Sequence, residues 1–177
     1  HGEYPLTSTE EDMEAFCRSQ IQSISRYLEY TKLWTFNNPF KFENGEVEYI
    51  LGNYYQLNIN VDSTSRQKIE MDEENKKINL TIRCKENVSK YLDKYFRHLL
   101  KNYIQEIIPE LEDVLDVKSS GFKIGKLKDA YGCCNKDGFL KFDPILYRKS
   151  KDAVKTVVLH ELCHIKEFNH KGEFFEL

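Results

Sequence analysis

The sequence has few histidines, few glycines and prolines, and no long apolar run. Its 177 residues include five histidines, eight glycines and four prolines, and the formal net charge is −3. Without a long apolar run, we expect no membrane-spanning helix. We also expect no nucleic-acid partner, because binding to a phosphate backbone calls for a basic surface. No linker, repeat or low-complexity tract divides the chain, which suits one globular unit.

Cysteine usage argues against a disulfide framework. The five cysteines are odd in number and scattered, and no Cys-x-x-Cys pair occurs, so we expect no separate structural zinc site. They are Cys17, Cys84, Cys133, Cys134 and Cys163. Free thiols are typical of a reducing cytosol, and no signal peptide is visible, so we expect a cytoplasmic protein. The first residue is histidine rather than methionine, which indicates a processed end, a fragment or a tag remnant.

Three of the five histidines fall in one window near the C-terminus. His160, Glu161 and His164 form a His-Glu-x-x-His motif, and His170 follows after five more residues. On a helix, histidines four apart project from one face with Cβ atoms about 5–6 Å apart, which suits two ligands of one zinc. The glutamate beside the first histidine can then act as a base toward a water at the metal. The window predicts a Zn²⁺ site with hydrolytic chemistry.

The residues around the motif are mostly apolar. They are Val157, Val158, Leu159, Leu162, Cys163 and Ile165. This pattern predicts a largely buried helix, in which Cys163 is a small buried apolar side chain. A charged surface helix can carry the same motif by accident. In a buried helix, however, two histidines and a glutamate need partners, and a zinc ion supplies one.

The third metal ligand is predicted to be His170. We expect the helix to end near Phe168, with Asn169 in the left-handed conformation that helix ends favour. That reversal would bring His170 back toward the metal. Glu167 and Glu173 are rival ligands, but zinc sites commonly draw three protein ligands and leave the fourth position to water. Glu161 is then the general base, which takes the proton of the attacking water and passes it to the leaving amine.

The order of predicted elements indicates an α+β fold with a small antiparallel sheet packed against helices. Ser8 and Glu11 form a capping box, which predicts a helix to about Leu33, followed by a loop over 35–42. Alternating segments 47–51, 54–61, 66–71 and 77–83 predict an antiparallel meander. A second helix is expected over 87–108, ended by Pro109 and followed by a short helical turn through Leu115. Strands 122–127 and 139–142 would form a hairpin, and Asp152 would begin the motif helix. The apolar face expected for the second helix comprises Tyr91, Leu92, Tyr95, Leu99, Tyr103 and Ile107.

The spacing of the three histidines is that of metzincins, but those have glycine where Glu167 stands and a methionine turn downstream. The chain instead resembles the YgjP-like metallopeptidase family, which is related to the Wss-like and SprT-like proteases. The family pattern is His-Glu-Leu-x-His, four residues, Asn-His, and a phenylalanine four later. Matching positions are His160 to His164, Asn169-His170 and Phe174. Further matches are Tyr131 to Cys134, Asp137-Gly138, Phe139 to Pro144, Asn44 to Glu46, Leu51 to Leu57 and Lys94 to Arg97.

The resemblance implies a zincin-like C-terminal metal-binding helix, with His160, His164 and His170 as zinc ligands and Glu161 as the catalytic residue. It covers residues 42–177, so we expect a metallopeptidase domain there and an N-terminal helix and linker over 1–41 packed on it. The sequence departs from the family pattern in three respects. Tyr131 replaces the usual tryptophan, Ala130 stands where a basic residue is common, and the chain stops soon after Phe174.

The predicted function is hydrolysis of peptide bonds, with a peptide or protein as substrate and no membrane partner. One alternative is a metal-dependent phosphohydrolase acting on nucleotides. It would need a phosphate cradle, and the only lysine-rich segment, with lysines at 118, 123, 126 and 128, is more simply a solvated hairpin face. The other alternative is a non-catalytic, metal-stabilised binding module, against which the intact Glu161 argues.

Further candidates concern the substrate. Tyr131, Tyr147 and Arg148 are weaker candidates for polarising a substrate oxygen. Residues 132–134 are either an ordinary hairpin strand or an edge strand that pairs with an extended peptide. Cys133 and Cys134 are adjacent, so in a strand they point to opposite faces and do not easily share one zinc. The oligomeric state is not written in the sequence.

Overall fold

The computed structural model describes residues 42–166, and they have the predicted α+β composition. The predicted N-terminal helix and linker, residues 1–41, lie outside the described residues. The first sheet contains β1 (Val47–Ile50), β2 (Asn53–Val61), β3 (Lys68–Asp72) and β4 (Lys77–Ile82). The short 3-10 helix η1 (Lys85–Asn87) leads into the long helix α2 (Val88–Leu115). The remaining elements are β5 (Gly121–Ile124), β6 (Gly132–Cys134), β7 (Phe139–Phe142), η2 (Pro144–Arg148) and α3 (Lys151–Lys166).

The first sheet has the four predicted strands, but the predicted antiparallel meander is wrong. The strand order is β1-β2-β4-β3, and β2 pairs with β4 in parallel. β4 takes an inner place beside β2 because Ile78, Leu80 and Ile82 alternate along it and are all buried. β3 is more exposed and lies at the edge. The chain after β2 passes the end of β4, where the Asp62 N–H donates to the Ile82 carbonyl oxygen at 2.9 Å. β3 is thereby placed on the far side of β4.

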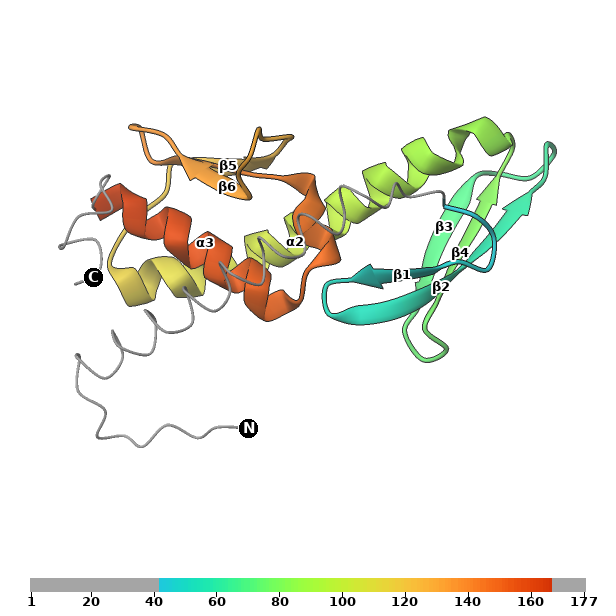
Figure 1. The fold of residues 1–177 in the computed structure, drawn as a ribbon, viewed down its shortest axis with the longest axis horizontal. Coiled ribbons are helices and arrows are strands. Elements are labelled where there is room, and N and C mark those ends of the chain that lie inside the picture. The colour runs from blue at the N-terminus through green and yellow to red at the C-terminus, as the bar shows by residue number, and fades with distance from the viewer. Residues whose placement is uncertain (1–41, 167–177) are drawn as a thin grey trace.

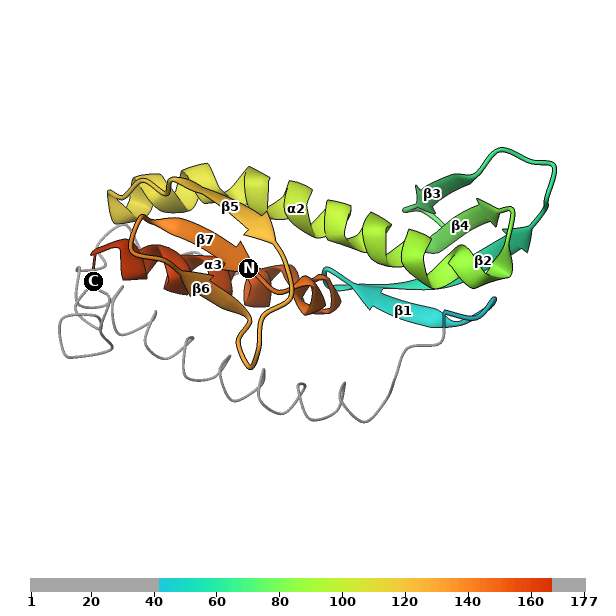
Figure 2. The ribbon, with the colours of Figure 1, turned by 90° about the horizontal axis from the view of Figure 1, so that it is seen from above.

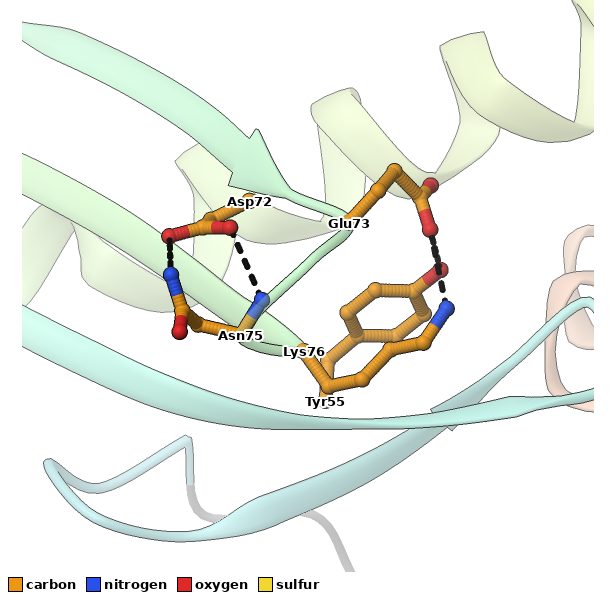
Figure 3. A network of polar contacts seen from close by, with 5 residues as sticks. All are labelled: Tyr55, Asp72, Glu73, Asn75 and Lys76. Carbon is orange, nitrogen blue, oxygen red and sulfur yellow. Dashed lines mark hydrogen bonds and ion pairs between the residues drawn. The ribbon is translucent and has the colours of Figure 1, made fainter.

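The turn between β3 and β4 is held by side chains. Both carboxylate oxygens of Asp72 accept hydrogen bonds from Asn75, one from its backbone N–H and one from its side-chain amide. Beside it, Glu73 accepts from the Tyr55 hydroxyl at 2.7 Å and pairs with Lys76 at 3.1 Å. Figure 3 shows both groups, with the lysine chain lying over the Tyr55 ring. These contacts fix the hairpin next to the body of the first sheet.

Helix α2 continues through Pro109 to Leu115, so the predicted end of the helix at Pro109 is wrong. Proline removes one N–H and crowds the preceding turn, which destabilises a helix interior by about 3 kcal/mol. The helix continues because Ile107 and Ile108 before the proline and Leu111 after it are buried in the core, and this packing outweighs the local penalty. Its buried residues include Leu92, Phe96, Leu100, Ile104, Ile107, Ile108 and Leu111. The buried face of α2 therefore lies slightly to one side of the predicted one. Of the predicted residues, Leu92 and Ile107 are buried, whereas Tyr91, Tyr95, Leu99 and Tyr103 are only partly buried.

The second sheet has the order β5-β7-β6, and here the predicted hairpin of the first and last strands is wrong. β5 pairs with β7 in parallel, while the true hairpin joins β6 to β7. Its turn is closed by the Asn135 side chain, which accepts from the N–H groups of Asp137 and Phe139. Gly138 follows with φ of +71°, which glycine adopts without a steric penalty.

The two sheets and two helices share one apolar core. Figures 1 and 2 show α2 running along the molecule, with the first sheet beside its N-terminal end. The second sheet and α3 lie along its C-terminal half. The short segment from β7 to α3 meets β1, where the Leu51 N–H donates to the Tyr147 carbonyl at 2.8 Å. Neither helix of the described residues is long and apolar enough to cross a membrane.

Candidate metal centre

Helix α3 carries the His-Glu-x-x-His motif and begins one residue before the predicted Asp152. Its start is capped by Ser150, whose hydroxyl accepts a hydrogen bond from the Ala153 N–H at 3.2 Å. One face is buried through Val154, Val158 and Leu162, each with no measurable exposure. The helix is therefore largely buried, as predicted, with its fully buried side chains on one face, while Cys163 is half-buried rather than buried.

His160 and His164 lie next to each other on α3, as the four-residue spacing predicts. Their ring centroids are 4.8 Å apart and the ring planes are nearly perpendicular, at 88°. Both residues are half-buried. Two neighbouring imidazoles at a partly open face suit a zinc site, because zinc takes histidine nitrogen at about 2.0–2.1 Å in tetrahedral geometry. The pair can supply two of the ligands that such a site needs.

The third ligand is not settled by the described residues. Across residues 42–166, no group of three or more histidine, cysteine, aspartate or glutamate side chains is placed to hold a metal ion. The predicted ligand His170 lies outside this part of the chain, as do the rivals Glu167 and Glu173. The assignment of His170 therefore stays a prediction.

Glu161 is buried beside the histidine pair and packs directly on β6. Only 6% of the residue is exposed. A Cβ added to Gly132 would lie 2.7 Å from both the Cγ and an oxygen of Glu161, so the carboxylate occupies the space that a side chain at Gly132 would fill. Burial raises the pKa of Glu161 to about 7, partly offset by a hydrogen bond from the backbone of Cys134. A carboxyl group with a pKa near 7 is well placed for general base or acid chemistry.

Among residues 42–166, strand β6 pairs with β7 alone and is an edge strand of the second sheet, and it is also the hairpin strand that the sequence predicts. Cys133 and Cys134 lie on opposite faces: Cys133 is exposed, and Cys134 is half-buried and near Glu161. Burial raises the pKa of Cys134, and the Glu161 charge raises it further. All four cysteines of the described residues are free thiols, and Cys17 lies outside them.

Two of the three residues proposed to polarise a substrate oxygen are buried away from solvent. The Arg148 guanidinium pairs with Glu48 at 2.8 Å, with both side chains under a tenth exposed. Its Nε donates to the Tyr147 hydroxyl at 2.8 Å. These contacts commit Tyr147 and Arg148 to a packed cluster between β1 and η2. Tyr131, which directly precedes Gly132, is the remaining candidate of the three.

Sequence reasoning did not anticipate the contact of Gly132 with Glu161 or the burial of Lys149 beside Tyr131. Lys149 is only 2% exposed, and its ammonium lies 5.6 Å from the centre of the Tyr131 ring. Burial lowers the pKa of Lys149 to about 8. A lysine has no local pattern that distinguishes a buried from an exposed position. Gly132, in contrast, stands in a short strand, and such a glycine indicates a close approach of another group.

A hollow of about 390 Å³ lies elsewhere, between the first sheet, α2 and the start of α3. Its lining includes Ile50, Tyr55, Glu73, Leu99, Tyr103 and Lys151. Lys151 precedes His160 by nine residues, which is about 14 Å along a helix. The hollow is therefore separate from the candidate metal centre.

A family model described as a YgjP-like, metallopeptidase domain matches residues 3–177. This range includes the motif, His170 and the segment before residue 42, which the sequence resemblance had left out. No curated protein and no solved structure gives a significant match.

Proposed function

The chain belongs to the YgjP-like metallopeptidase family, and we propose that it is a zinc-dependent peptidase with Glu161 as its general base. The family makes it a metallohydrolase. The observation that carries the finer proposal is the position of Glu161, a buried carboxylate directly beside two adjacent histidines. A residue needed only for packing at this place would be apolar, because a buried carboxylate is costly.

The proposed metal ligands are His160 and His164 on α3 with His170 downstream. The adjacent rings and the imidazole chemistry fit zinc. When bound, zinc acidifies a coordinated water and polarises the scissile carbonyl. Glu161 takes the proton of the attacking water and later delivers it to the nitrogen of the leaving amine. The Cys134 N–H orients this carboxylate, and Gly132 leaves the room in which it sits.

A peptide substrate is favoured because β6 lies directly beside Glu161. In the described part of the chain, β6 pairs with β7 on one side only. An extended peptide can add to such an edge by backbone hydrogen bonds, and this would carry its scissile bond past the Glu161 carboxylate. Hydrolysis of nucleotides and a purely structural metal site remain the alternatives. A base held against the metal ligands has no role in a structural site.

The division of the chain at residue 41 and a cytoplasmic location are parts of the same proposal. The four cysteines of the described residues are free thiols, which agrees with a reducing compartment. The substrate would be a protein or peptide, in keeping with a peptidase family.

Glu161→Gln tests the role of the base. We expect cleavage of a peptide library to fall by about 10²–10⁴-fold, because general base catalysis contributes that much, with the zinc content unchanged. Glu106→Gln, at an exposed position of α2, is the matched control and should leave cleavage unchanged. A Glu161→Gln protein that holds zinc and still cleaves at the wild-type rate would refute the assignment.

A further inference from the structure

Positive charge is concentrated in one part of this acidic chain. Residues 118–141 contain six lysines against two aspartates, a net charge of +4, while the whole chain has −3. The segment spans β5, β6 and β7. The structure therefore collects on one small sheet a charge opposite to that of the rest of the molecule.

The lysines lie on the outer face of the second sheet. Lys141 on β7 is the register partner of Lys123 on β5 and of Cys133 on β6, so these three form one row across the sheet. The next row, Phe122, Leu140 and Cys134, faces the helices, and Leu140 is fully buried. Figure 2 looks onto the outer face, with α3 behind it. The exposed residues Lys126, Lys128 and Lys136 lie in the adjoining loops, and we call the five lysines 123, 126, 128, 136 and 141 the lysine face.

The lysine face carries an internal repulsion. Like charges on register partners of neighbouring strands destabilise a sheet, yet Lys123 and Lys141 stand in these positions. Lys141 donates to the Lys126 carbonyl at 2.9 Å, and Lys123 lies over the Phe139 ring at 5.8 Å. At the start of the segment, Lys118 pairs with Glu112. The six lysines of the segment outnumber its two aspartates, Asp129 and Asp137, so the segment keeps an excess of positive charge.

We propose that the lysine face selects acidic polypeptide segments as substrates, an inference that rests on the proposed peptidase function. A peptide strand added to β6 would place alternate side chains in the row of Cys133, Lys141 and Lys123. Lys128 precedes β6 and Lys136 follows it, each next to an exposed aspartate, so the positive charge near the edge comes from the excess of lysines in the segment as a whole. Acidic residues at alternate positions of the substrate meet this charge, and basic residues are repelled by it.

A polypeptide fits this surface better than a nucleic acid. The charged row has the two-residue period of a strand and continues at an edge whose backbone groups pair with an extended peptide. No basic excess surrounds it, since the rest of the chain is acidic. The contacts are exposed, so the preference should weaken as salt screens the charges.

The test is binding without turnover, on the zinc-loaded full chain carrying Glu161→Gln. Two fluorescein-labelled peptides are compared, in which threonine alternates with glutamate in one and with lysine in the other. The protein is titrated into each peptide at low and at high salt, and binding is followed by fluorescence anisotropy. We expect the glutamate peptide to bind about tenfold more tightly at low salt, with the difference shrinking at high salt. Adding Lys123→Glu and Lys141→Glu should abolish the preference. The control pair Lys85→Glu and Lys90→Glu makes the same change of net charge at exposed positions near the start of α2 and should keep it.

Equal affinity for the two peptides would overturn the inference, as would an equal loss in the control pair. The inference would also be overturned if single-stranded DNA bound as tightly as the glutamate peptide and lost this affinity when Lys123 and Lys141 were replaced by glutamate. Cleavage by the wild-type protein separates the two proposals. If the glutamate peptide binds selectively but no peptide is cut, the peptidase proposal is refuted and the charge selection by the lysine face stands. If peptides are cut without regard to their charge, the peptidase proposal stands and the charge selection is refuted.

Discussion

The carboxylate of Glu161 lies in the space that a side chain at Gly132 would fill, with a Cβ at Gly132 only 2.7 Å from one carboxylate oxygen. This contact joins the helix that carries the motif to the edge strand above it. It holds the proposed base in place by packing on one side and by the Cys134 backbone on the other. The position of the Glu161 carboxylate therefore depends on glycine at residue 132 as well as on the motif that contains Glu161.

Gly132→Ala should displace the Glu161 carboxylate and lower kcat for peptide cleavage by about 10²-fold, because a misplacement near 1 Å costs that much. Zinc content should stay at the wild-type level, since no proposed ligand is touched. Gly125→Ala is the matched control, because its Cβ would meet only the flexible end of Lys141, at 3.0 Å. Unchanged kcat in Gly132→Ala would contradict the packing account.

Glu48→Ala should destabilise the protein by about 3–5 kcal/mol, measured by urea denaturation, because it leaves the buried Arg148 charge unpaired. Burial raises the pKa of Glu48 and Arg148 opposes the shift, so the pair is held together at a desolvation cost. The double change Glu48→Leu with Arg148→Met should recover most of the loss. Glu110→Ala breaks an exposed pair with Lys155 and should cost under about 1 kcal/mol. Equal effects of Glu48→Ala and Glu110→Ala would show that burial does not matter.

Lys149 predicts a pH dependence of stability. Burial lowers its pKa in the folded protein to about 8, against 10.5 for an ordinary lysine. Between these two values the unfolded chain binds more protons than the folded one, so this residue makes stability rise with pH over that window. Below about pH 8 its burial works against folding. Lys149→Met removes this pH-dependent cost of burying the ammonium, so the variant should be more stable than the wild type near pH 8. The difference in unfolding free energy between the two proteins should then narrow from pH 8 to pH 10.5. A constant difference would show that the amine is not desolvated.

Lys123→Glu should leave the fold intact and raise the free energy of unfolding by about 0.2–1 kcal/mol, because it replaces a like-charge neighbour of Lys141 with an opposite charge. The measurement is the urea midpoint, with Lys85→Glu as control, for which we expect a change within about 0.5 kcal/mol. A clear loss of stability in Lys123→Glu would mean that Lys123 serves the fold, through its contact with Phe139, rather than a partner.

The sequence around the motif predicted the features of α3 that depend on neighbouring residues, namely the shared face of the two histidines and the start of the helix. The spacing of His160 and His164 put both rings on one face, and the helix begins at Lys151, one residue before the predicted Asp152. Both errors of sheet topology concern pairing between distant strands. The alternation of Ile78, Leu80 and Ile82 indicates that β4 is a buried strand. The residues of the turns, however, do not predict that β4 lies between β2 and β3. Tertiary burial likewise decided Pro109, where apolar neighbours on α2 outweighed the local penalty of a proline.

The contacts that complete the site were beyond sequence reasoning for the same reason. The approach of Gly132 to Glu161 depends on β6 crossing α3, which follows from the order of the second sheet. The ion pair of Arg148 with Glu48 joins segments that no local pattern relates. It also removed Arg148 from the set of residues available to a substrate.

The proposed zinc site is built from three histidines, and it is tested most directly by the metal content of the purified full chain, measured by mass spectrometry. We predict about one zinc per chain in the wild type, with affinity lowered by about a hundredfold or more in His170→Ala and in His164→Ala. His98→Ala, on the exposed flank of α2, serves as the control and should keep its zinc. A wild-type protein without zinc after reconstitution would contradict the account. So would a His170→Ala protein that binds zinc normally while Glu167→Ala or Glu173→Ala loses it.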